Sequence, residues 1–137
     1  MYTLIRRVCF YETDGMRVVY HGNYINWLEE ARVEYLRLGG IDLNELMAEG
    51  IVFPVLEIHV KYLQSARFDD VVEVRTYLRK VDRASLAVDY ELVRQRDGAL
   101  LVKASSLSTY TDMKTGKIRR LSKEQVKKLV ALSEEDR

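Results

Sequence analysis

An acidic residue beside a glycine, followed closely by the start of an amphipathic segment, is the pattern in this chain best suited to chemistry. Asp14 and Gly15 lie in a loop, a short apolar run follows, and residues 21–24, His-Gly-Asn-Tyr, open the amphipathic segment. The N-terminus of a helix has free backbone amides and a partial positive charge. The order therefore predicts a carboxylate close to donors that can polarise a carbonyl group.

Asp14 is the candidate catalytic group. Its carboxylate is expected to be ionised at neutral pH. It could attack a carbonyl carbon and form a transient anhydride, or it could act as a base on water, and both routes stay open. Without the surrounding motif, the simpler interpretation would be a turn residue before Gly15.

The donors for a developing oxyanion are expected at the predicted helix start. Tyr20, His21 and Gly22 are the candidates, and Asn23 is the expected N-cap. His21 could contribute its backbone amide or its imidazole, and the amide is the preferred interpretation. Cys9 lies in an apolar strand-like run with no histidine at a recognisable spacing, so it is interpreted as a plain thiol.

The helix that would hold these donors is predicted from a helical period of apolar residues. Gly39-Gly40 is a stop signal for this helix. Residues 42–45, Asp-Leu-Asn-Glu, resemble a capping box for a second, short helix ending near Gly50. The aromatic residues near the start of the long helix are interpreted as core rather than as a box for an acyl group. The apolar positions of the long helix are Tyr24, Trp27, Leu28, Ala31, Tyr35 and Leu38.

The segment before these helices is rich in strand-forming residues, and from Ile51 onward the pattern changes to period two. Asp97-Gly98 is a hairpin signal, and Thr115-Gly116 marks another turn. Residues 122–125, Ser-Lys-Glu-Gln, form a capping-box pattern before a short basic helix. One expected strand has an apolar face made of Ala84, Leu86, Val88, Tyr90 and Leu92. The expected strands span residues 2–10, 71–81, 83–96 and 99–112.

The order of these elements predicts the fold class. One amphipathic helix and a long, half-apolar antiparallel sheet need each other as cover, which gives a two-layer α+β fold. Residues 1–137 contain no linker, repeat or low-complexity segment, so we expect one domain.

Composition narrows the function. The chain is 47% hydrophobic and 31% charged with a net charge of +1, which argues against a general nucleic-acid binder. It has no apolar run long enough for a membrane span and no apolar stretch typical of a secretory signal, so we expect a cytoplasmic protein. One cysteine and two histidines argue against an internal disulfide and a structural metal site.

The loop and helix motif resembles a known family. Its strongest parts are Glu12-Thr13-Asp14, Val18-Val19-Tyr20-His21 and Asn23-Tyr24. Supporting stretches lie across residues 5–121, among them Glu29-Glu30-Ala31-Arg32, Lys61-Tyr62, Ala66-Arg67-Phe68-Asp69-Asp70 and Asp82-Arg83-Ala84-Ser85-Leu86. This ordered set is similar to the hotdog-fold acyl-CoA thioesterases of the 4-hydroxybenzoyl-CoA thioesterase and Tol–Pal-associated type.

The resemblance implies a function and a site. It implies a hotdog fold, hydrolysis of an acyl- or aroyl-CoA to the free acid and coenzyme A, Asp14 as the catalytic carboxylate and the His21 amide facing the thioester carbonyl. It also implies a homodimer or homotetramer with the coenzyme A site at the subunit interface, and no cofactor besides the coenzyme A of the substrate. The alternatives are a non-catalytic protein that binds acyl-CoA or acyl carrier protein and, ranked last, an enoyl thioester hydratase, because no hydration motif is found.

Basic residues are the candidates for the coenzyme A phosphates. Arg83 and Ser85 lie in the stretch that resembles the family's cofactor-contacting strand. Residues 114–128 hold seven basic side chains and one acidic one, so Lys117, Arg119 and Arg120 are either phosphate ligands or part of a solvated face.

Two further positions carry expectations. Arg17 stands where the family often has glycine, and it could narrow the acyl pocket, pair with Asp14 or point to solvent. Pairing would weaken Asp14 as a nucleophile. His59 lies in a strand-like run and is interpreted as structural.

Overall fold

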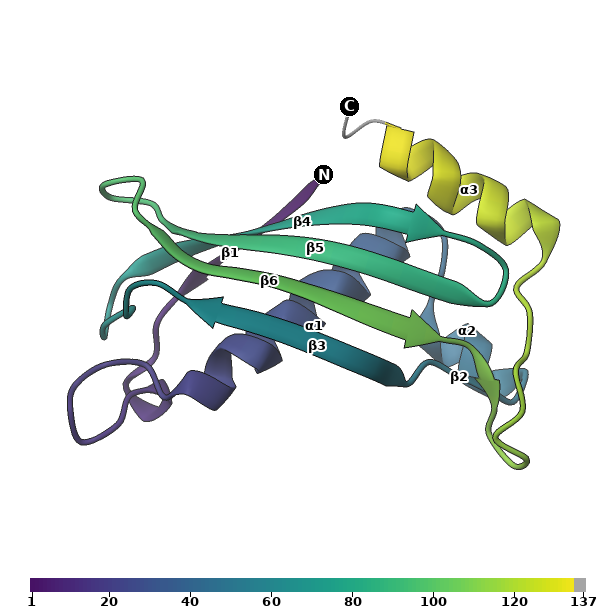
Figure 1. Ribbon diagram of the computed structural model, residues 1–137, viewed down its shortest axis with the longest axis horizontal. Coiled ribbons are helices and arrows are strands. Elements are labelled where there is room, and N and C mark those ends of the chain that lie inside the picture. The colour runs from purple at the N-terminus through teal and green to yellow at the C-terminus, as the bar shows by residue number, and fades with distance from the viewer. Residues whose placement is uncertain (135–137) are drawn as a thin grey trace.

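A long helix crosses one face of an antiparallel sheet in the computed structural model, which describes residues 1–134 (Figure 1). The five strands follow the order β1-β4-β5-β6-β3, and every neighbouring pair is antiparallel. The predicted α+β class is therefore confirmed. The strands are β1 (Tyr2–Arg7), β3 (Val55–Tyr62), β4 (Val71–Val81), β5 (Ser85–Arg94) and β6 (Leu100–Thr109).

Helix α1 (His21–Leu38) covers the sheet with the apolar face that its period predicts, except for Leu38, which lies at the end of the helix and is 64% exposed. Trp27, Leu28 and Ala31 are fully buried in the core. The helix ends at the predicted glycines, since Gly39 is the C-cap and Gly40 has a positive φ of 80°. The facing surface of β5 is the predicted apolar one, with Leu86, Val88, Tyr90 and Leu92 all buried.

The prediction of Asn23 as the N-cap of α1 is wrong. The N-cap is Tyr20, and the helix begins at His21. The side-chain amide of Asn23 donates instead to the backbone carbonyl of Glu12 at 2.8 Å. Asn23 therefore stabilises the loop before the helix from a position inside the first turn.

The first strand is shorter than the predicted 2–10. β1 ends at Arg7, and residues Phe10–Glu12 form a single 3-10 turn, η1. The reason lies in the side chain of Glu12, which accepts a hydrogen bond from the Cys9 amide at 2.8 Å and so turns the chain away from the sheet. The second predicted strand, 71–81, is β4 with the same bounds.

The strands predicted over 83–96 and 99–112 are trimmed by turns. The Asp82 carboxylate accepts hydrogen bonds from the Ala84 and Ser85 amides, which delays the start of β5. β6 is followed by the short β7 (Thr111–Asp112), which pairs with β2 (Ile51–Val52) as a separate ribbon. The predicted turn glycines Gly98 and Gly116 both have a positive φ.

The two remaining helices start as predicted. α2 (Leu43–Ala48) is capped by the side chain of Asp42, which accepts from the Asn44 amide. α3 (Lys123–Glu134) begins after a reciprocal capping box, in which Ser122 and Gln125 each bind the other's backbone amide. No helix within residues 1–134 is long and apolar enough to cross a membrane.

The sheet has two edge strands, β1 and β3. The β3 edge carries exposed apolar side chains at both ends, with Val55 and Leu56 at one end and Tyr62 and Leu63 at the other. Strand edges of this kind present unpaired backbone groups and are ready to pair with another strand.

Candidate active site

Asp14 lies at the tip of a small hairpin that leads directly into α1. Its backbone amide donates to the Val18 carbonyl at 2.9 Å, and Thr13 pairs with Val19 in an antiparallel bridge. One carboxylate oxygen of Asp14 accepts a hydrogen bond from the Met16 amide at 2.8 Å. The side chain is exposed, so its second oxygen is accessible to a substrate.

The hairpin ends at the first amides of the helix. The Tyr20 amide donates to the Glu12 carbonyl at 2.9 Å and is therefore unavailable to a substrate. Within residues 1–134, the backbone amides of His21 and Gly22 have no hydrogen-bond acceptor. Three residues of extended chain, about 10 Å, separate Val18, opposite Asp14, from His21. Asp14 and the two free amides are therefore neighbours along the hairpin and the helix start.

The surroundings of His21 are aromatic. The Tyr62 hydroxyl donates to the His21 backbone carbonyl at 3.1 Å, and the rings of Tyr20 and His21 lie 4.3 Å apart. A cavity of about 200 Å³ opens beside the helix start. It is lined by Val19, His21, Tyr24, Tyr62, Leu63, Gln64 and Ser65.

Arg17 adopts an unusual backbone conformation. Its φ is 68°, in the left-handed region that favours glycine. The guanidinium is exposed and forms no ion pair with Asp14 or with any other residue in the described part of the chain. Of the three expectations for Arg17, pairing with Asp14 is therefore wrong.

Glu12 is a residue of this site to which the sequence motif assigned no role. Its side chain is buried, and it accepts hydrogen bonds from Arg6 at 2.7 Å, the Trp27 indole at 2.7 Å and the Cys9 amide at 2.8 Å. Burial by itself raises the pKa of this carboxyl, but these three hydrogen bonds and the charge of Arg6 outweigh it, so the pKa lies below its ordinary value. A glutamate is usually exposed, and the partners Arg6 and Trp27 lie in two other elements, so local patterns gave no signal.

The candidate coenzyme A residues gather at the other end of the molecule, and three of them already have internal partners. The Arg83 guanidinium donates to the Leu121 carbonyl, and the Ser85 hydroxyl contacts the carboxylate of Asp82. Arg119 forms an ion pair with Asp112 at 3.0 Å. The exposed side chains of Lys117 and Arg120 have no acidic partner within residues 1–134.

These two groups of residues are separated by the length of the sheet. Tyr62, at the C-terminal end of β3, contacts the helix start, whereas the basic residues lie near the β2–β7 ribbon beyond Val55, at the N-terminal end of β3 (Figure 1). Eight residues of strand correspond to about 25 Å. One chain therefore does not bring its own Asp14 and its own basic cluster into one site.

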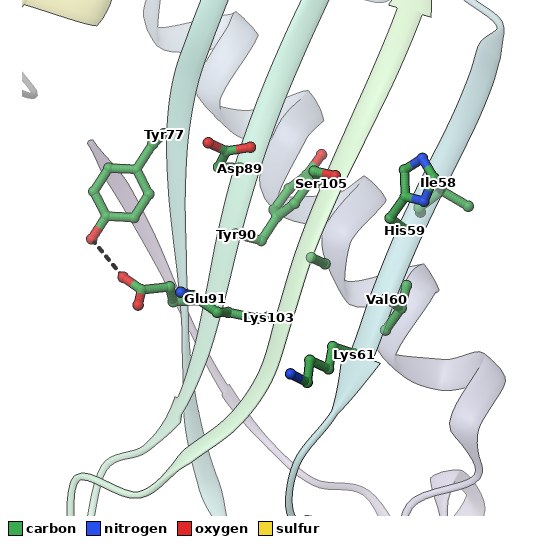
Figure 2. A pocket seen from close by; sticks show the side chains of 11 residues that line it. Ile58, His59, Val60, Lys61, Tyr77, Asp89, Tyr90, Glu91, Lys103 and Ser105 are labelled. Carbon is green, nitrogen blue, oxygen red and sulfur yellow. Dashed lines mark hydrogen bonds between the residues drawn. The ribbon is translucent and has the colours of Figure 1, made fainter.

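A larger cavity lies on the sheet face turned away from α1. It measures about 950 Å³ and is lined by polar side chains, including Asp89, Glu91, Lys103 and His59 (Figure 2). The Tyr77 hydroxyl donates a hydrogen bond to Glu91 at 3.4 Å, drawn as the dashed line in Figure 2. This cavity contains neither Asp14 nor the helix amides, so it is not the candidate catalytic site. His59 lies in β3 as expected, but it is exposed on this face.

Cys9 has no catalytic surroundings. Its thiol is partly buried and contacts the backbone carbonyl of Arg7 at 3.8 Å. Tyr24 and Trp27 are buried in the core, as expected. The Trp27 indole also donates a hydrogen bond to the Glu12 carboxylate, and the Tyr24 hydroxyl accepts one from the Ala66 amide.

Known proteins resemble this chain in sequence and in structure. Residues 8–129 match the Thioesterase-like superfamily. The acyl-CoA thioester hydrolase YbgC of Escherichia coli is 35% identical over 117 residues, which cover 85% of this chain and 87% of that protein.

Solved structures show the same architecture. A DHNA-CoA thioesterase from Staphylococcus aureus has a TM-score of 0.89 at 30% identity, with 99% of this chain and 95% of that chain covered. A second S. aureus protein, SAV2348, solved in complex with CoA, has a TM-score of 0.90 at 18% identity, covering 97% and 84%. At 18% identity, this similarity shows a shared fold and nothing more.

Proposed function

The chain belongs to the thioesterase-like superfamily, with its hotdog fold, and we propose that it is an acyl-CoA thioester hydrolase in which Asp14 is the catalytic carboxylate. One observation carries the assignment of the site. The hairpin with Asp14 at its tip runs straight into two unsatisfied amides at the start of α1. A carboxylate a few residues along the chain from free oxyanion donors suits acyl transfer.

The reaction follows from this geometry. The thioester carbonyl oxygen accepts hydrogen bonds from the His21 and Gly22 amides, which stabilise the negative charge that develops on it. The free oxygen of Asp14 either attacks the carbonyl carbon, giving an anhydride that water then hydrolyses, or removes a proton from the attacking water. In both routes the carbon–sulfur bond breaks, the thiolate of coenzyme A leaves and takes a proton, and the acyl group leaves as a free acid.

We place the phosphates of coenzyme A on the basic residues of a second subunit. Two β3 edges that pair in antiparallel fashion bring the Val55 end of one protomer next to the Tyr62 end of the other. The exposed Lys117 and Arg120 of one subunit then approach the Asp14 hairpin of its partner. Arg83, Ser85 and Arg119 support that surface through their internal contacts. We place this homodimer, or a tetramer built from it, in the cytoplasm.

Hydrolysis of a panel of acyl-CoA substrates by the wild type and Asp14→Asn tests the catalytic assignment. Loss of the carboxylate is expected to lower kcat by about 10²–10⁴-fold while the protein stays folded and still binds coenzyme A. Asp89→Asn is the matched control, because Asp89 is a partly exposed aspartate on the opposite sheet face. Equal turnover by wild type and Asp14→Asn would show that the chemistry lies elsewhere.

Coexpression of two inactive variants tests the shared site. Asp14→Asn and the double variant Lys117→Glu, Arg120→Glu should each have a low kcat/KM alone. A heterodimer of the two contains one intact site only if Asp14 and the basic pair come from different subunits. Recovery of kcat/KM in the mixed dimer supports the proposal, and no recovery contradicts it.

A non-catalytic binding protein was the alternative to hydrolysis. Its physical basis was neutralisation of Asp14 by Arg17. The described residues contain no such ion pair, so no observation favours this alternative.

A further inference from the structure

The side chain of Glu12 connects β1, the chain just before its own 3-10 turn, and α1. One carboxylate oxygen binds Arg6 of β1 and the indole of Trp27 in the second turn of α1, each at 2.7 Å. The other oxygen binds the Cys9 amide at 2.8 Å. Arg6 also lies over the Trp27 ring, 5.1 Å from its centre. The carboxylate is therefore held from two directions, by the sheet and by the helix.

The backbone of the same residue holds the start of α1. The Glu12 carbonyl accepts hydrogen bonds from the Tyr20 amide at 2.9 Å and from the Asn23 side chain at 2.8 Å. Glu12, at the base of the first arm of the Asp14 hairpin, thus binds the end of the second arm and the first turn of α1. The next pair along the hairpin is the Thr13–Val19 bridge, and Asp14 follows opposite Val18.

This arrangement has a consequence for Asp14. The carboxylate at the hairpin tip is exposed, and its only hydrogen bond within residues 1–134 is to the Met16 amide of its own turn. Its distance from the His21 and Gly22 amides is therefore set from the base of the hairpin, where Glu12 is anchored. Reaction rates are sensitive to such distances, and a displacement of about 1 Å can cost on the order of 10²-fold.

We infer that Glu12 is a positioning residue for the hydrolysis: its buried carboxylate fixes the Asp14 hairpin against β1 and α1, and so sets the Asp14 carboxylate at reacting distance from the oxyanion amides. Glu12 does not touch the substrate and acts only through Asp14. The inference rests on the proposed role of Asp14 in the hydrolase.

Glu12→Gln is the informative substitution. Both carboxylate oxygens accept from N–H donors, so whichever way the glutamine amide is turned, its NH₂ group faces a donor. The hairpin must shift to relieve this conflict. Glu30→Gln is the matched control, because Glu30 binds the same Arg6 at 3.1 Å but is half exposed and does not contact the hairpin.

In steady-state kinetics, folded Glu12→Gln should show a lower kcat and a nearly unchanged KM. We expect kcat to fall by about 10–10²-fold with KM for the acyl-CoA within about twofold of wild type, because the Glu12 side chain is buried and does not touch the substrate. Glu30→Gln should keep wild-type kcat. A folded Glu12→Gln with wild-type kcat, or a loss that appears only in KM, overturns the inference.

A double-mutant cycle separates positioning from general structural damage. If Glu12 acts through Asp14, adding Glu12→Gln to Asp14→Asn lowers the residual rate no further. The same fold-loss in both backgrounds overturns the inference. Wild-type turnover by Asp14→Asn would overturn the proposed catalytic residue and this inference with it.

Glu12→Asp provides the test if Glu12→Gln does not fold. It keeps the negative charge beside Arg6 but is one methylene too short to reach all three donors. A folded Glu12→Asp is expected to show the same loss in kcat at unchanged KM, and wild-type kcat in this variant overturns the inference.

Discussion

Two acidic residues separated by one threonine have opposite environments in this protein. Glu12 is buried and binds three donors, whereas Asp14 is exposed and keeps one oxygen free. A buried carboxylate with its hydrogen bonds satisfied is rigid, and an exposed one with a free oxygen can react. The spacing of two residues thus places a buried, fixed carboxylate next to the carboxylate that we propose is catalytic.

The anchor makes stability depend on pH in the acid range. The pKa of Glu12 lies below its ordinary value of 4.5 in the folded protein, because three hydrogen bonds and Arg6 outweigh burial. Its contribution is therefore fully present above the pKa of the unfolded chain and is lost as the pH falls through the folded pKa. We expect Glu12→Gln to lower the free energy of unfolding by about 2–4 kcal/mol at pH 7 and by less below pH 4. Denaturant unfolding of both proteins between pH 7 and pH 3 measures this, and a difference that stays constant with pH would contradict it.

At the scale of elements, the start of α1 is where sheet, hairpin and helix meet. Tyr20 is the N-cap with φ −60° and ψ 132°, and it has no side-chain capping bond. Such an uncapped start would normally cost stability, because the first amides of a helix lack partners. In the proposed mechanism, the free amides of His21 and Gly22 bind the carbonyl oxygen of the substrate.

Substitution of His21 distinguishes its amide from its imidazole. His21 is the first residue of the helix, where proline is well tolerated, and the ψ of Tyr20 suits a residue before proline. His21→Pro removes the amide and the imidazole, whereas His21→Ala removes only the imidazole. We expect kcat to fall by about 10²–10³-fold for His21→Pro and only slightly for His21→Ala. Equal losses in the two variants, measured on folded protein, would assign the role to the imidazole.

At the scale of the whole molecule, the separation between the Asp14 hairpin and the basic residues is the main feature. The length of β3 lies between them, and the β3 edge is unpaired and apolar at both ends. An antiparallel pairing of two such edges satisfies the edge and brings the two groups together. In the proposed dimer, the site is therefore formed by residues of both subunits.

A charge on the β3 edge should separate the subunits. Leu56 is 60% exposed on β3, and Ile5 is 59% exposed on the opposite edge strand, β1. We expect Leu56→Asp to convert the oligomer to monomers in light scattering and to abolish turnover, while Ile5→Asp keeps both. If only Ile5→Asp dissociates the oligomer, the interface lies at β1 instead.

Local patterns in the sequence were enough for much of the fold. Helix α1, its glycine stop and the apolar face of β5 follow from periodicity and turn residues, which act over a few neighbouring positions. Asp14 and His21 stood out for the same reason, because the loop and the helix start are adjacent in the chain.

The tertiary structure decided the features that depend on distant partners. The anchor at Glu12 needs Arg6 and Trp27, and Tyr62 reaches the helix start from β3. The early end of β1 follows from the hydrogen bond between Glu12 and the Cys9 amide, which the periodicity of the sequence does not predict. The separation of Asp14 from the basic residues likewise follows from the order of the strands in the sheet. That order decides which segments lie close together in space, whatever their separation in the sequence.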